Sequence, residues 1–215
     1  MGRRERGPAL SLRRLLAGPV EEAARGLLGC ALSAGGVTVR ITETEAYAGM
    51  RDAASHAFRG RTPRNEIMFG PAGFAYVYFT YGMHWCMNVV CGPDGEASAV
   101  LLRAGEVVRG LATARERRPA ARRDAELARG PARLCSTLGI TREHYGVDLL
   151  ALGSAVRLRR PRAVGEPPEI EAGPRVGVTG AHDIPWRFWY ADDPTVSTYR
   201  RHVPRARAQE RQPQL

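Results

Sequence analysis

The sequence predicts an α+β fold: a single compact domain built on a curved, mainly antiparallel sheet, with a protruding β-hairpin and flanking helices. The length of 215 residues permits one domain with a proper core, because a chain of this size buries roughly 70% of its extended-chain surface. A helical segment is followed by several segments with the period-2 alternation of strands, two of them joined by a tight turn. Together these two observations favour one sheet with helices packed on it.

Residues 19–32 are predicted to form the first helix. Pro19 falls in the first turn, where the missing N–H is not needed, and Glu21 and Glu22 interact favourably with the positive end of the helix dipole. Apolar residues recur at helical spacing through the segment.

A strand is predicted at residues 37–47. Because successive side chains of a strand point to opposite faces, Glu43, Glu45 and Tyr47 share one face, and Thr42, Thr44 and Ala46 share the other. Two carboxylates and a phenol are therefore expected to point the same way.

Residues 74–91 are predicted to form a β-hairpin with its turn at residues 80–83, where Gly82 supplies the conformational freedom. Tyr81 lies at or near the tip. The next strand is expected at residues 99–108, and it places Arg103 among apolar neighbours. A buried guanidinium needs an anionic partner.

The rest of the chain is less regular. Residues 109–129 are a charged stretch, and residues 130–134 open an apolar helix with proline in its first turn, a start that could hold phosphate or could simply begin a buried helix. Arginine alternates with apolar residues over 156–164, which predicts a strand. A loop rich in Glu and Pro is expected at 165–174, and a last strand is expected to begin at 175–178.

The charge of the chain is strongly basic and is carried by arginine alone. Formal net charge is +10, and all 32 basic residues are arginine, with no lysine. This composition favours polyanions, nucleic acid first, although a GC-rich coding sequence would produce the same arginine bias. Without lysine, only the N-terminal amine could form a Schiff base, so water is the expected nucleophile in any attack on a sugar carbon.

The sequence offers little support for a metal, a membrane segment or a cofactor. His84, Cys86 and Cys91 invite a zinc interpretation, but alternation along an apolar strand explains them better and no fourth ligand is evident. No apolar run approaches the roughly 20 residues that span a bilayer. We therefore expect no metal, no cofactor and no membrane contact, and a monomer that stays inside the cell, in the cytoplasm with the nucleoid if bacterial or in the nucleus if eukaryotic.

Side chains suited to catalysis and to stacking a planar ligand are concentrated in residues 43–103. Four of the seven tyrosines and four of the five phenylalanines fall in this block, beside the two carboxylates. Enzymes that extrude a base from duplex DNA replace the lost stacking with protein aromatic rings, and a side chain must fill the vacated space. Tyr81 is our candidate for that wedge; the alternative is an ordinary exposed turn tyrosine.

Ordered motifs within and beyond this block carry a family resemblance. They are Glu43-Thr44-Glu45-Ala46-Tyr47, Ala53-Ala54-Ser55-His56, Thr62-Pro63-Arg64-Asn65, Tyr76-Val77-Tyr78-Phe79-Thr80-Tyr81-Gly82-Met83, Met87-Asn88, Val100-Leu101-Leu102-Arg103-Ala104, Gly130-Pro131-Ala132-Arg133-Leu134-Cys135 and Arg175-Val176-Gly177-Val178. With these motifs the chain resembles the alkyladenine (3-methyladenine) DNA glycosylase family. The resemblance implies a glycosylase domain at residues 10–203, and from the sequence itself we expect flexible tails at 1–9 (basic) and 204–215.

The resemblance implies a catalytic role for three positions. Glu45 would activate the water that attacks C1′, with Arg103 and the backbone around Val178 helping to hold that water. A carboxylate beside a guanidinium stays ionised, as a general base must. Glu43 is the rival carboxylate on the same face, and only the motif match ranks Glu45 above it.

The same resemblance assigns the base pocket and the DNA contacts. Tyr47, His56 and Tyr78 would stack the flipped base, and Asn88 would disfavour guanine by crowding its exocyclic amine. The implied DNA-binding residues are Tyr81 as the intercalating side chain, with Met83, Arg59, Arg61, Thr62 and Arg64. Two departures affect this transfer: the segment between His56 and Thr62 is slightly shorter than the vertebrate pattern, and His84 stands where a tyrosine is common.

We therefore expect a monofunctional DNA glycosylase of base excision repair, bound to double-stranded DNA that contains a damaged purine. Its substrates would be of the 3-methyladenine, 7-methylguanine, hypoxanthine and ethenoadenine type, and its product an abasic site. A zinc deaminase is disfavoured because the H-x-E and P-C-x-x-C signature is absent. A metal-dependent nuclease using Glu43 and Glu45 remains a weaker alternative, and a non-catalytic damaged-DNA-binding protein is the second choice.

Overall fold

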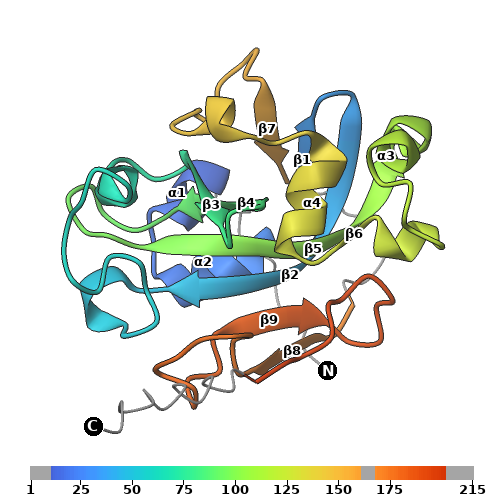
Figure 1. The fold of residues 1–215 in the computed structure, drawn as a ribbon. Helices are drawn as coiled ribbons and strands as arrows, with labels where there is room; N and C mark the ends of the chain where they lie inside the picture. The colour runs from blue at the N-terminus through green and yellow to red at the C-terminus, as the bar shows by residue number, and fades with distance from the viewer. Residues whose placement is uncertain (1–10, 161–167, 202–215) are drawn as a thin grey trace, which may run out of the picture.

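The computed structural model describes residues 11–160 and 168–201. The expected tails, residues 1–9 and 204–215, lie outside these ranges. Within them nine strands join into one open antiparallel sheet with four α-helices packed on it, which confirms the predicted α+β class (Figure 1). The main path of the sheet runs β3-β4-β5-β2-β1-β7, with β6 paired to β5, β9 to β2 and β8 to β9.

The strands of this sheet are β1 (Ala31–Ala34), β2 (Val37–Tyr47), β3 (Ala75–Thr80), β4 (His84–Val90), β5 (Ala99–Arg109), β6 (Ala128–Arg129), β7 (Val156–Arg159), β8 (Ile170–Gly173) and β9 (Arg187–Tyr190). Period-2 alternation located β2, the β3–β4 hairpin and β5 correctly. These are the strands that form the site.

The helices of the described chain are α1 (Leu12–Leu16), α2 (Val20–Leu27), α3 (Leu111–Arg117) and α4 (Pro131–Leu138), with short 3-10 turns η1 (Gly49–Arg51), η2 (Glu66–Phe69), η3 (Asp124–Glu126) and η4 (Arg142–His144). α4 confirms the helix expected to open with proline in its first turn. α2 contacts β2 and α4 contacts β4 and β5, so that the two helices cover opposite faces of the central strands (Figure 1).

The predicted first helix is too long at its C-terminal end. α2 ends at Leu27, and Gly29 then turns the chain with φ 78°, a left-handed conformation that favours glycine. Of residues 30–32, which the helical spacing had included, Cys30 leads into β1 and residues 31–32 belong to it. The segment with helical spacing is short, and a short run of apolar residues such as the one after Gly29 suits a buried strand equally well.

The C-terminal part of the chain departs most from prediction. β8 occupies part of the stretch expected to be a loop, and residues 175–178 are a loop rather than the start of a strand. Gly177 has φ 70°, which a strand does not accommodate, and the final strand is β9, further along the chain. β7 ends at Arg159, and residues 161–167 lie outside the described chain.

A pair of bulges between β2 and β5 positions the charged residues of the sheet. Ile41 pairs with Gly105 and Glu43 with Ala104, which leaves Thr42 as an extra residue; Thr44 then pairs with Leu102, so Arg103 is the extra residue on β5. Bulges bend a strand and re-aim its side chains. Here the result is that Arg103 points between Glu43 and Glu45.

Candidate active site

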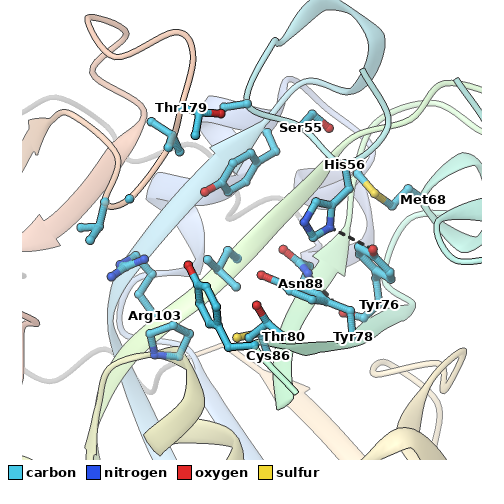
Figure 2. A pocket seen from close by; sticks show the side chains of 18 residues that line it. Ser55, His56, Met68, Tyr76, Tyr78, Thr80, Cys86, Asn88, Arg103 and Thr179 are labelled. Carbon is cyan, nitrogen blue, oxygen red and sulfur yellow. Dashed lines mark hydrogen bonds between the residues drawn. The ribbon is translucent and has the colours of Figure 1, made fainter. Parts of the chain in front are cut away.

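A pocket of about 430 Å³ is lined by residues of β2, β5, the β3–β4 hairpin and the N-terminus of α4 (Figure 2). Its lining is Tyr47, Ala54, Ser55, His56, Met68, Tyr76, Tyr78, Thr80, Tyr81, Cys86, Asn88, Leu101, Arg103, Pro131, Val176, Gly177, Val178 and Thr179. Six of the seven residues expected at the base pocket and reaction centre lie in this lining; the seventh, Glu45, is bonded to three lining residues from behind the wall.

Aromatic rings make up much of the wall. His56 meets Tyr78 edge-on with ring centroids 4.6 Å apart, and Tyr76 lies 5.5 Å from Tyr78 at an angle of 30°. The His56 Nδ1 also bonds the Tyr76 hydroxyl at 3.0 Å. Because the rings hold one another through these contacts, the pocket presents ordered aromatic surface to a planar ligand.

The conformation of the His56 loop depends on Asn65, for which no role was predicted from the sequence. Asn65 is buried and its amide nitrogen donates to the carbonyls of His56 and Gly60 at 2.9 and 3.0 Å. Its carbonyl accepts from the Thr62 backbone N–H at 2.7 Å. Asn65 belongs to one of the motifs that carry the family resemblance, but the motif alone did not show that its side chain holds this loop.

Asn88 lies on β4 at the floor of the pocket and is 5% exposed. Its amide nitrogen donates to the Tyr76 carbonyl at 3.2 Å across the β3–β4 hairpin. This bond fixes the orientation of the carboxamide. The position of the Asn88 amide oxygen in the pocket lining is therefore fixed as well.

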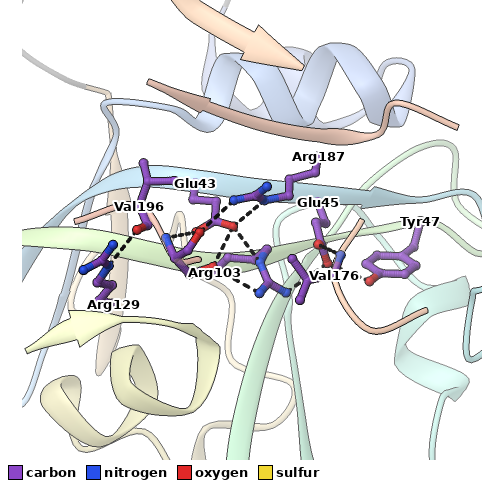
Figure 3. A network of polar contacts seen from close by, with 9 residues as sticks. Glu43, Glu45, Tyr47, Arg103, Arg129, Val176, Arg187 and Val196 are labelled. Carbon is purple, nitrogen blue, oxygen red and sulfur yellow. Dashed lines mark hydrogen bonds and ion pairs between the residues drawn. The ribbon is translucent and has the colours of Figure 1, made fainter. Parts of the chain in front are cut away.

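Glu45 is fully buried and accepts three hydrogen bonds, all from residues of the pocket lining (Figure 3). Its Oε1 accepts from the Val176 backbone N–H at 2.7 Å, and its Oε2 accepts from the Tyr47 hydroxyl at 2.8 Å and from Arg103 Nη1 at 3.2 Å. A carboxylate offers roughly four acceptor positions, so about one remains free. The carboxylate is thus held rigidly at the back of the pocket wall.

Glu43, the rival carboxylate, shares Arg103 with Glu45, but its other partners lie outside the pocket lining. Its Oε1 accepts from Arg103 Nε at 2.8 Å, from Arg187 Nε at 2.7 Å and from the Ser197 hydroxyl at 2.9 Å, and its Oε2 accepts from the Ser197 N–H at 2.7 Å. Burial alone would raise the pKa of Glu43, but the charges of Arg103 and Arg187 and the Ser197 bond outweigh it and lower that pKa. Glu43 therefore remains ionised and fully coordinated.

Arg103 has the anionic partner that its sequence context required, and in fact it has two. It is 6% exposed and bridges Glu43 and Glu45. Burial would lower the pKa of its guanidinium, but the charges of Glu45 and Glu43 outweigh that effect and raise it. Arg103 is a permanent cation within the wall of the pocket.

Burial also shifts the pKa values of three tyrosines and one histidine of the pocket. Burial, followed by the charge of Glu45, raises the pKa of the Tyr47 phenol well above its ordinary value. Burial and the nearby Cys86 likewise raise the pKa of Tyr78, and burial raises that of Tyr76 to about 12. Burial and the charge of Arg64 lower the pKa of His56, so that its imidazole is neutral at pH 7.

Val178 lines the pocket, but the backbone group that contacts Glu45 belongs to Val176. The segment that carries both valines is fixed by Arg175, which is 1% exposed and bonded to Asp52, also 1% exposed. This pair was not predicted from the sequence. Arg175 is the first residue of one of the motifs that carry the resemblance, but the motif does not indicate which acid Arg175 meets.

The expected wedge is at the tip of the hairpin. Tyr81 is 86% exposed and has φ 52°, an unusual conformation for a tyrosine, and Met83 beside it is 67% exposed. Backbone strain of this kind is often found at functional positions. Both side chains project from the protein next to the mouth of the pocket, which Tyr81 also lines.

The arginines expected to meet phosphates lie on the exposed loop that follows His56. Arg61 stacks over Phe69 at 4.6 Å, and Arg64 lies over Tyr78 at 5.5 Å and donates to the Phe79 carbonyl at 3.3 Å. Arg59 and Thr62 are also exposed. Because Arg64 is attached to the hairpin, it links the loop to the pocket wall.

Two further findings concern the described residues only. No group of three or more His, Cys, Asp or Glu side chains is arranged to hold a metal ion there. Likewise, none of the helices in that part of the chain is both long and apolar enough to cross a membrane.

Comparison with known proteins gives a consistent answer. The family model described as Methylpurine-DNA glycosylase (MPG) matches residues 14–194. A protein of Streptomyces avermitilis is 52% identical over 201 residues, which cover 91% of this chain and 94% of its own length. A protein of Nocardia farcinica is 54% identical over 193 residues, covering 86% and 88%. Both carry the name "Putative 3-methyladenine DNA glycosylase".

A strongly basic chain that holds a carboxylate and a guanidinium in the wall of an aromatic pocket has the features of an enzyme acting on nucleic-acid bases. The chain belongs to the methylpurine-DNA glycosylase family. It is accordingly a DNA glycosylase, a DNA-binding hydrolase of DNA repair whose partner is damaged DNA.

Proposed function

We propose that the protein flips an alkylated or deaminated purine out of duplex DNA into the aromatic pocket and hydrolyses its N-glycosidic bond with a water activated by Glu45. The observation that supports this most directly is the coordination of Glu45. Three pocket-lining donors hold it, and about one acceptor position remains for a water. The names of the relatives support substrates of the 3-methyladenine type.

In the proposed reaction the water oxygen forms a bond to C1′ while the bond from C1′ to the purine nitrogen breaks, and the electron pair leaves with the base. Glu45 takes the proton of the water, and its charge stabilises the oxocarbenium-like sugar. Cationic 3- and 7-alkylpurines leave as neutral bases. Hypoxanthine requires a proton, and the lowered pKa of His56 disfavours that residue as its source.

The proposed binding roles follow the positions of the side chains. Tyr47, His56 and Tyr78 would stack the flipped purine, and such stacking on aromatic rings contributes roughly 1 to 3 kcal/mol per base. Tyr81 would fill the space in the duplex that the purine vacates. Asn88, whose amide is pinned by Tyr76, would exclude guanine by crowding its exocyclic amine. Met83, Arg59, Arg61, Thr62 and Arg64 would contact the duplex beside the lesion, and Val178 would help to enclose the reaction centre.

The chain contains no lysine, so the Schiff-base route to strand cleavage is restricted to the N-terminal amine. The product is therefore proposed to be an abasic site in an intact strand. A non-catalytic damaged-DNA binder would use the same arginines and hairpin but would release no base.

The test is incubation of duplex DNA containing hypoxanthine, or a 3- or 7-methylpurine, with wild type and with Glu45→Gln. Free base is measured by chromatography, and strand integrity before and after alkali. We expect base release by wild type, an alkali-labile but intact strand, and a large loss of release in Glu45→Gln. Equal release by both proteins would contradict the role of Glu45. Nicking without alkali that chelator abolishes would indicate a metal nuclease, and tight binding without release would indicate the non-catalytic alternative.

A further inference from the structure

One buried cation close to the pocket has no part in the reaction described above. Arg175 is among the largest fully buried side chains of the described chain, yet it does not line the pocket. Its guanidinium contacts both oxygens of Asp52, at 2.5 Å from Nη1 and 2.8 Å from Nη2, and Nη1 also donates to the Ala46 carbonyl at 2.8 Å. Burying an ion pair in this way carries a large desolvation cost, which good geometry only partly offsets.

The guanidinium lies between two aromatic rings. It is 4.7 Å from the centroid of Tyr47 and 5.5 Å from that of Trp186, while its Nε has no hydrogen-bond partner among the described residues. Because Tyr47 lines the pocket and Arg175 does not, the cation supports this ring from outside the pocket. Arg175 thus fixes the position of an aromatic wall.

The same residue also fixes the backbone that binds Glu45. Val176 follows Arg175 directly, and its N–H donates to Glu45 Oε1 at 2.7 Å. The hydroxyl of Tyr47 donates to Glu45 Oε2 at 2.8 Å. Both oxygens of the carboxylate therefore have a donor whose position depends on Arg175.

We propose that Arg175, anchored by Asp52, is a positioning residue for catalysis: it holds Tyr47 and the Val176 N–H so that the free acceptor position of Glu45 points at the attacking water. This inference rests on the proposed role of Glu45 as general base. Arg175 itself touches neither the base nor the water. Its effect on the rate passes through Glu45, which distinguishes it from an ion pair that only stabilises the fold.

A double-mutant cycle separates the two roles. Base release from duplex DNA containing 7-methylguanine is measured under single-turnover conditions for wild type, Arg175→Met, Glu45→Gln and the double variant. This cationic base leaves easily, which keeps the residual rate of Glu45→Gln measurable. Affinity for the same duplex is measured alongside.

We expect Arg175→Met to slow base release by roughly 10²-fold in the wild-type background, the size of loss typical of a misplaced catalytic group. In the Glu45→Gln background the same substitution should change the rate hardly at all, and affinity for the duplex should be close to that of wild type in every variant. An equal loss in both backgrounds would overturn the proposal, and so would a loss confined to affinity or no loss at all.

Asp52→Asn is the second variant, because it keeps the shape of the pair and removes only the charge. If Arg175→Met does not fold, the cycle with Asp52→Asn decides, and a smaller loss of rate that again disappears in Glu45→Gln is expected. Arg40→Met is the control: Arg40 lies on β2 and, like Arg175, forms ion pairs, with Glu106 and Asp193, but away from the pocket. Its rate should equal that of wild type.

The outcomes also separate this inference from the proposed function. If Glu45→Gln releases base as fast as wild type, the general-base assignment fails and this proposal fails with it. If Glu45→Gln is slow but the effect of Arg175→Met adds to it, only the positioning role of Arg175 is wrong.

Discussion

Glu43 and Glu45 lie two residues apart on the same face of β2, both fully buried and both bonded to Arg103, yet their surroundings differ. Glu43 receives its remaining hydrogen bonds from Arg187 and Ser197, outside the pocket. Glu45 receives its own from Tyr47 and Val176, which line the pocket. The partners, rather than burial or charge, separate a structural carboxylate from a candidate catalytic one.

The difference also explains why two carboxylates are present. Arg103 needs neutralising in the sheet, and Glu43 does this while binding β5, β9 and the segment at Ser197 together. Glu45 is then free to keep an acceptor position for chemistry. The comparison can be tested by removing one charge at a time.

The largest expected effect is on activity. Glu45→Gln should lower the rate of base release by roughly 10²- to 10⁴-fold, the usual contribution of a general base, whereas Glu43→Gln should lower it much less at a temperature where the variant is folded. Single-turnover base release from hypoxanthine-containing duplex measures both. A larger loss in Glu43→Gln than in Glu45→Gln would reverse the assignment.

Stability should show the opposite order. Glu43→Gln leaves Arg187 without its carboxylate and should lower the free energy of unfolding by about 3 to 5 kcal/mol, as expected for breaking a buried ion pair. Glu45→Gln should cost about 1 to 2 kcal/mol, because the amide oxygen still accepts from Val176 and Arg103 keeps Glu43. Urea unfolding of the two variants beside wild type measures this. Equal losses would mean that both carboxylates are structural.

The division between these two carboxylates marks the limit of what the sequence could predict. Alternation along residues 37–47 placed both side chains on one face correctly, and the apolar neighbours of Arg103 correctly implied an acidic partner. The partners that tell the acids apart come from far along the chain: Arg187 is 144 residues from Glu43, and Val176 is 131 residues from Glu45. Local patterns carry no information about such contacts.

The error at residues 175–178 has the same origin. Residues 175–178 look like the start of a strand because valine alternates there, but Gly177 turns the chain and Arg175 is drawn into the interior by Asp52. Strand patterns succeeded in β2 and β5, whose side chains are largely buried in the sheet. They failed at residues 175–178, where a tertiary ion pair fixes the chain.

The pH dependence of stability offers a finer test. The pKa of Glu43 is lower in the folded protein than its ordinary value of 4.5, so its contribution to stability is fully present above pH 4.5 and is lost as the pH falls through the folded pKa. Each unit of lowering corresponds to about 1.4 kcal/mol. The difference in unfolding free energy between wild type and Glu43→Gln should therefore shrink between pH 6 and pH 3. A difference that stays constant over this range would mean that Glu43 gains no stabilisation from its charge.

The smallest expected effects come from single hydrogen bonds around the two acids. Ser197→Ala removes a hydroxyl that donates to Glu43 and accepts from Arg103 Nη2, and it should lower the free energy of unfolding by about 1 to 2 kcal/mol with base release unchanged. Tyr47→Phe removes one hydroxyl donor of Glu45 but keeps the ring, and should lower the rate of base release with affinity for damaged duplex unchanged. Urea unfolding and single-turnover release are measured on both variants. If Tyr47→Phe lowers only stability, the Tyr47 hydroxyl has no role in the reaction. If Ser197→Ala slows release as much as Tyr47→Phe does, the two networks are not separate, because the Arg103 bridge would be transmitting a change at Glu43 to Glu45.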